Sequence, residues 1–127
     1  MSNSADFLAH VLELMRPTAG ATANTRPMFG GHGLYADGVI VGIVIDDVVY
    51  LKTDEVNRAE FAALGLAPFV YATRHGDSYA TSYFRAPDDA LDNVATMADW
   101  LRSAMGASLR KPAVKPAKRA RTTAAKI

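Results

Sequence analysis

The sequence has no cysteine, no long apolar run and no targeting pattern, and each absence excludes a class of protein. Without cysteine there are no disulfides, no thiolate metal sites and no cysteine nucleophile. No apolar run approaches the ~18 residues of a membrane span, and the N-terminus lacks the basic and apolar regions of a signal peptide. We therefore expect a cytoplasmic protein that does not associate with membranes.

Motifs that indicate catalysis or a cofactor are also missing. The three histidines, His10, His32 and His75, have neither H-x-x-x-H nor H-E-x-x-H spacing, and no serine lies in a nucleophile elbow. The adjacent acids Asp46 and Asp47 would leave most of a Ca²⁺ or Mg²⁺ shell unfilled, so a turn is the better interpretation. We therefore expect no enzymatic activity, no metal and no cofactor.

Acidic residues are absent from the last twenty positions, although the whole chain has a net charge of only +1. Residues 1–107 contain seven Lys and Arg against thirteen Asp and Glu, a net charge of −6. Residues 108–127 carry +7 with two prolines and no aromatic residue, a composition typical of disordered segments. The sequence thus predicts a folded domain at 1–107 and a disordered, basic Lys/Pro/Ala-rich tail at 108–127. The cations of this tail are Arg110, Lys111, Lys115, Lys118, Arg119, Arg121 and Lys126.

Among the residues that are present, the stretch from 28 to 52 is the most informative. Six of the seven residues from 39 to 45 are β-branched, which favours a strand, and the lack of polar alternation indicates that both its faces are covered. Asp37-Gly38 and the weaker Asp46-Asp47 are turn signals, because these residue types tolerate a positive φ. We therefore predict a three-stranded antiparallel meander at about 25–36, 39–45 and 48–53.

Three glycines, at positions 30, 31 and 33, interrupt the first of these strands. Glycine inside a strand usually marks a bulge, a bend or a close approach of two backbones. The other interpretation, a phosphate-binding loop, lacks support because no Lys-Ser/Thr follows and the next element is a strand rather than a helix. We favour a structural bulge and keep small-ligand binding at the Gly30–Gly33 bend as the alternative. Pro27 has no backbone donor, so that end of the strand is expected to be an edge or irregular.

Helices are predicted where apolar residues recur at three- and four-residue intervals. We expect a first helix at about 4–16 that ends at Pro17, a second after Lys52, and a third that begins with Pro87 in its first turn. Strands at 68–73 and 78–84 complete the pattern, and alternation in the second of them places Tyr79, Thr81 and Tyr83 on one side. The resulting order is α-βββ-α-ββ-α, which predicts an α+β fold with helices packed on an antiparallel sheet.

A series of motifs in a fixed order extends this pattern over residues 5–106. They are R-x-M-F-G-G-H-G-L-Y at 26–35, D-G at 37–38, Y-L-K at 50–52, D-E-x-N-R at 54–58, G-L-x-P-F at 65–69 and S-Y-x-x-x-P at 82–87. This series resembles the N-terminal domain of the TfoX (Sxy) family of bacterial competence regulators, from which Pro27 is a departure. The resemblance implies a fold similar to secretion chaperones. It also implies a role in competence-gene activation and DNA transformation, alongside the cAMP receptor protein or another protein of the transcription machinery.

Three functions are compatible with these features. The resemblance favours a non-catalytic regulatory module that contacts a protein partner, and an exposed sheet edge would also allow a homodimer. Seven tail cations would allow weak, sequence-independent nucleic-acid binding. The glycine bend would allow binding of a small ligand. The candidate contacts for a ligand or partner are Arg26, His32, Tyr35 and Lys52; Arg26 and Lys52 could bind an anion or pair with surface acids, and His32 could instead be structural.

Overall fold

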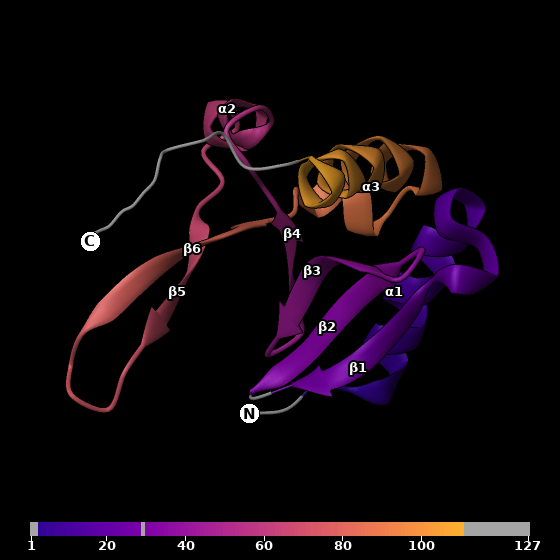
Figure 1. The fold of residues 1–127 in the computed structure, drawn as a ribbon. Helices are drawn as coiled ribbons and strands as arrows, with labels where there is room; N and C mark the ends of the chain where they lie inside the picture. Colours follow the sequence, from indigo (N-terminus) through magenta and orange to yellow (C-terminus); the bar gives the residue numbers. More distant parts are fainter. Residues whose placement is uncertain (1–2, 29, 111–127) are drawn as a thin grey trace.

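One six-stranded antiparallel sheet with the order β1-β2-β3-β4-β6-β5 organises the structure, a computed structural model that describes residues 3–28 and 30–110 (Figure 1). Helices precede, interrupt and follow the strands, so the predicted α+β class is confirmed. The elements are α1 (Ala5–Ala19), η1 (Gly20–Thr22), β1 (Asn24–Met28), β2 (Gly31–Ala36), β3 (Val39–Ile45), β4 (Val48–Lys52), α2 (Arg58–Ala63), β5 (Pro68–Ala72), β6 (Ser78–Arg85), η2 (Asp88–Leu91) and α3 (Val94–Leu109).

Helices α1 and α3 pack against each other and cover the same face of the sheet over β1 to β4 (Figure 1). The side chains between these helices and the sheet are apolar and buried, and they form the core of the molecule. Its largest fully buried members include Phe61 of α2, Met15 of α1, Leu34 of β2, Leu51 of β4 and Met97 of α3. The β5–β6 hairpin extends away from both helices, so neither of them covers it (Figure 1).

The two predicted turns of the meander are present. Asp37 and Gly38 have φ angles of 52° and 80°, and Asp46 and Asp47 have φ angles of 51° and 59°. Two successive positive φ angles are the signature of a type I′ hairpin turn, whose twist matches that of the flanking strands. Between the turns, Val44 of β3 belongs to the core and is fully buried on the helix side. Ile43, on the opposite side of the strand, does not belong to the core cluster but is only 6% exposed. Both faces of the strand are therefore buried at these two residues, as predicted, although the helices cover only one of the faces.

The first strand of the predicted meander is instead two strands, β1 and β2. Gly30 adopts a φ of 78°, which is inexpensive for glycine, and the chain reverses so that Met28 pairs with Gly31. The meander thus has four strands, and β1 lies at the edge of the sheet, as expected from Pro27. The irregular register lies between Leu34 and Tyr35 rather than at the glycines.

Two predicted helix ends also differ. Helix α1 continues through Pro17 to Ala19, although a proline inside a helix lacks the N–H that would bond the carbonyl four residues earlier. Pro87 precedes the short 3₁₀ turn η2, and α3 begins later, where the Asn93 side chain accepts a hydrogen bond from the Thr96 N–H. An N-cap of this kind favours a helix start at that residue, because it satisfies a backbone N–H of the first turn.

Close packing of β3 against β4 at Gly42 yields a stability prediction. An added Cβ at Gly42 would lie 2.5 Å from the Tyr50 carbonyl oxygen, so Gly42→Ala forces the backbones apart and is expected to cost about 1–3 kcal/mol of unfolding free energy. Gly106→Ala in α3 is the control, because its Cβ would meet only the end of the Arg110 side chain at 3.0 Å. Chemical denaturation should show a loss for the first variant and no loss for the second. Equal stabilities would contradict this account of the strand packing.

Candidate binding site on the uncovered face of the sheet

Alternation along β1 and β2 divides the predicted contact residues between the two faces of the sheet. Leu34 and Ala36 of β2 are buried under the helices, so Gly31, Gly33 and Tyr35 present the opposite face. We call this second face, over β1 to β6, the uncovered face. Arg26 pairs with Gly33 in the β1–β2 register and therefore lies on the uncovered face beside Tyr35.

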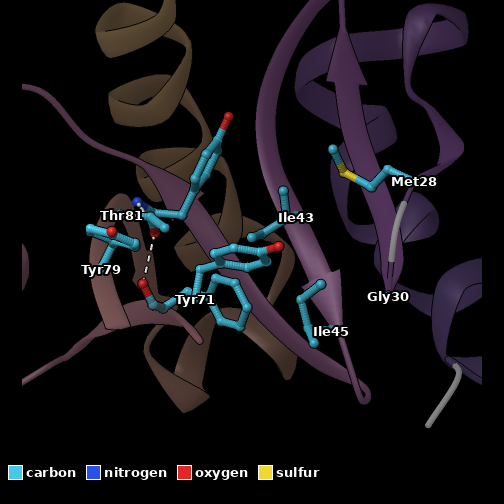
Figure 2. A pocket seen from close by; sticks show the side chains of 9 residues that line it. Met28, Gly30, Ile43, Ile45, Tyr71, Tyr79 and Thr81 are labelled. Atoms are coloured by element: carbon cyan, nitrogen blue, oxygen red, sulfur yellow. Dashed lines mark hydrogen bonds between the residues drawn. The ribbon is translucent and has the colours of Figure 1, made fainter. Parts of the chain in front are cut away.

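A cavity of about 570 Å³ is hollowed into the uncovered face. Its walls come from two parts of the sheet: β1 and β3 on one side and the β5–β6 hairpin on the other (Figure 2). Because β4 separates these strands in the sheet order, the sheet must curve around the cavity. The lining residues are Met28, Gly30, Ile43, Ile45, Phe69, Tyr71, Tyr79, Thr81 and Tyr83.

The hairpin wall is aromatic and internally fixed. Tyr71 pairs with Tyr79 in the β5–β6 register, and the Thr81 hydroxyl donates a hydrogen bond to the Phe69 carbonyl at 2.8 Å (Figure 2). The Phe69 ring lies 5.2 Å from the Tyr50 ring between centroids, a favourable aromatic separation. None of the nine lining residues carries a charge, so the cavity favours an apolar occupant.

Two cations stand beside aromatic rings of the same face. The Arg26 guanidinium lies 4.8 Å from the centroid of the Tyr35 ring, and the Lys52 ammonium lies 5.0 Å from that of the Tyr83 ring. The ammonium also donates a hydrogen bond to the Ser82 hydroxyl at 3.0 Å. Burial raises the pKa of the Tyr83 phenol, and the proximity of Tyr35 adds to the rise. Tyr83 is therefore a neutral hydroxyl at physiological pH and can donate a hydrogen bond.

His32 is separated from the other three candidates. It shares the helix-covered side of β2 with Leu34 by alternation, and its Nδ1 is hydrogen-bonded to the Asn3 side chain at 3.0 Å. The same amide donates to the Val44 carbonyl at 2.7 Å. Its contacts are those of a structural histidine that links the segment before α1 to β2 and β3. Of the predicted set, the structure brings together Arg26 and Tyr35, and places Lys52 beside Tyr83.

Of the seven tail cations, only Arg110 is among the described residues; the other six lie outside them. Arg110 forms a two-pronged ion pair with Asp54, with Nε–Oδ2 and Nη2–Oδ1 distances of 2.6 and 2.8 Å. The Arg110 guanidinium holds the pKa of the Asp54 carboxyl well below its usual range. This contact joins the end of α3, which extends to Leu109, to the loop before α2.

The hairpin residues of the cavity are the part that sequence reasoning did not assign to a site. The period-two placement of Tyr79, Thr81 and Tyr83 on one side was a usable signal, because alternating aromatic residues on an uncovered strand face indicate a contact surface. What it could not indicate is that Ile43 and Ile45, two strands away, form the opposite wall.

The structure is that of a small α+β domain with one helix-covered and one uncovered sheet face. A family model described as the TfoX N-terminal domain matches residues 14–108, three quarters of the chain. The chain therefore belongs to this family, which at the family level is one of competence-related regulatory modules. No curated protein sequence matches the chain.

Two further observations concern residues 3–28 and 30–110. None of the helices in this part of the chain is long and apolar enough to cross a membrane. Within the same residues, no group of three or more His, Asp and Glu side chains is arranged to hold a metal ion.

The Asp54–Arg110 pair predicts an acid-dependent contribution to stability. Because the folded state lowers the pKa of Asp54, the contribution is present above the ordinary value of 3.8 and is lost as the pH falls below it. Asp54→Asn keeps an oxygen acceptor for the Val56 and Asn57 N–H groups but removes the charge. Its melting temperature should lie below that of the parent chain at pH 7, and the gap should close towards pH 2.

Asp99→Asn is the matched control for this titration. Asp99 also pairs with an arginine, Arg102, at 3.2 Å, but its side chain is 80% exposed, and exposed pairs contribute little. Calorimetry from pH 2 to 7 should therefore show a small gap for this variant at every pH. A gap for Asp54→Asn that does not change with pH would contradict the assignment.

Proposed function

We propose that the chain is a non-catalytic, cytoplasmic regulatory module that takes part in competence control by contacting a protein of the transcription machinery. The observation that carries the proposal is the β5–β6 hairpin, which extends from the body without helix cover (Figure 1). Large apolar and aromatic side chains are exposed on it: Val70 is 50%, Tyr71 45% and Tyr79 58% exposed. Tyrosine is enriched at protein–protein interfaces because it supplies a large contact area and a polar tip.

Membership in the family supplies the kind of partner in this proposal. From membership in a family of competence-related regulatory modules we infer action on gene expression, so RNA polymerase holoenzyme and the cAMP receptor protein are the partners to test first. Regulation of this kind requires a binding surface and no reactive group. The hairpin offers such a surface over both of its faces, since Val70 points away from the cavity that its neighbour Tyr71 lines.

A pair of valine substitutions tests the hairpin as the contact. Val70→Ser should weaken binding to the transcription partner about fivefold or more, because truncating an exposed apolar side chain at a contact typically costs about 1 kcal/mol or more. Val94→Ser is the matched control, since Val94 is 44% exposed at the start of α3. Biolayer interferometry with purified RNA polymerase holoenzyme and cAMP receptor protein measures both variants. Absence of binding by the parent chain to either protein, or equal affinities of the two variants, would contradict the proposal.

Nucleic-acid binding by the tail is a second candidate function. It is favoured by the charge pattern, because residues 108–127 carry seven cations and no acid while residues 1–107 carry a net charge of −6. Arg110 is held by Asp54, so six cations remain for phosphate contacts. We infer binding that is weak and independent of sequence, because phosphate contacts position a protein without reading bases.

The salt dependence of DNA binding tests this second candidate. Six phosphate contacts should give a slope of about −5 for the logarithm of the association constant against that of the salt concentration. A full-length variant with all six tail cations replaced by glutamine should lose duplex DNA binding, because its remaining body is acidic. Fluorescence anisotropy on two unrelated duplexes measures slope and specificity together. Retained affinity in the glutamine variant would rule out the tail as the binding element.

A further inference from the structure

The cavity on the uncovered face has the size and lining of a site for a small molecule. Its volume of about 570 Å³ lies within the range of small-molecule sites in proteins. The wall of β1 and β3 contributes Met28, Ile43 and Ile45, and the hairpin wall contributes aromatic rings (Figure 2). An occupant must therefore offer an apolar body to both walls.

The cations beside this cavity are placed to receive a negative charge. Lys52 stands over the ring of Tyr83, which lines the cavity. Arg26 stands over the ring of Tyr35, which lies on the same uncovered face as Tyr83. Within residues 3–28 and 30–110, neither Arg26 nor Lys52 forms an ion pair with an acid. Both cations thus retain the capacity to bind an anion beside an apolar cavity.

The glycines of β2 connect the cation at Arg26 to the cavity wall. A Cβ on Gly33 would lie 2.9 Å from Cε1 of Tyr35 and 3.4 Å from Sδ of Met28. The Tyr35 ring, over which Arg26 lies, and the Met28 sulfur at the cavity wall are therefore both next to Gly33. A charged head group held by Arg26 would consequently be continuous with a body inserted beside Met28.

We propose that this cavity binds a small monocarboxylate with an apolar body, aliphatic or aromatic. The body fills the space between Ile43, Ile45 and the hairpin rings, and the carboxylate is held at the rim by Arg26 and Lys52. The Tyr83 hydroxyl, which donates no hydrogen bond within the described residues, is available as a neutral donor to the carboxylate. This site goes beyond the proposed function; although Tyr71 and Tyr79 belong to both surfaces, Val70 is not a lining residue, so the two proposals can be tested separately.

Octanoate is the probe for the first test, and 1-octanol of equal chain length is the neutral comparison. Isothermal titration of the full-length chain should show saturable binding of one octanoate per chain. The alcohol should bind about tenfold more weakly, because it lacks the charge-assisted hydrogen bonds to the two cations. Absence of saturable octanoate binding, or equal affinities for the two probes, would overturn the proposal.

Variants of the chain then test separately where the carboxylate and where the apolar body of the ligand bind. Arg26→Gln combined with Lys52→Gln should lower the affinity for octanoate about tenfold and leave that for octanol unchanged. Arg58→Gln, which removes an exposed cation of α2, is the control and should change neither affinity. Ile45→Trp should fill the cavity and abolish binding of both probes. Melting temperatures of all variants show whether each remains folded.

Two results would assign the cavity to another occupant. If the double glutamine variant binds octanoate as well as the parent chain does, the cations are not the anion site. If ultracentrifugation shows a dimer that Ile45→Trp dissociates and octanoate does not, a second copy of the chain fills the cavity. Either result overturns the carboxylate assignment, and neither depends on whether Val70→Ser affects a protein partner.

Discussion

Helix cover on only one face of the sheet is the constraint on which the rest of the structure depends. Burial of Leu34, Val44 and Leu51 beneath α1 and α3 fixes which alternate residues of each strand are sealed. The intervening residues of β3, Ile43 and Ile45, are as apolar as the sealed ones and need cover of their own. The sheet supplies it by curving, so that the β5–β6 hairpin faces β3 across β4. The cavity on the uncovered face is the consequence.

Local signals in the sequence predicted the parts of the fold that depend on local chemistry. The β-branched run forms β3, and both Asp-containing turns have positive φ angles. Pro27 lies in an edge strand, as expected for a residue that lacks a backbone N–H donor. Helix ends were less predictable, since Pro17 is tolerated in the last turn of α1 and Asn93 rather than Pro87 fixes the start of α3. The position of a helix end depends on several competing capping residues and prolines, each of which changes the stability of the helix by only about 1–3 kcal/mol.

The candidate site was predictable only in part, because it depends on contacts between distant segments. Arg26, His32 and Tyr35 were named together as candidate contacts, and Arg26 lies over the ring of Tyr35. His32 lies on the other face, because strand alternation separates it from Tyr35. Which of the two faces is covered is decided by α1 and α3, not by β2 itself. The hairpin wall was missed for the same reason: its register with β4 pairs Tyr83 with Lys52, thirty-one positions earlier in the chain.

The glycine motif shows why a choice between a structural and a ligand-binding role was too narrow. Gly30 reverses the chain with a positive φ and also lines the cavity. At Gly31 a side chain would meet the Val44 backbone, so this glycine permits close strand packing. At Gly33 a side chain would displace Tyr35 and Met28. Because the Arg26 guanidinium lies over the Tyr35 ring, this cation–π contact would be disturbed as well. Because the turn, the strand pairing and the cavity rim all lie within four residues, a substitution that spares the fold can still disturb the site.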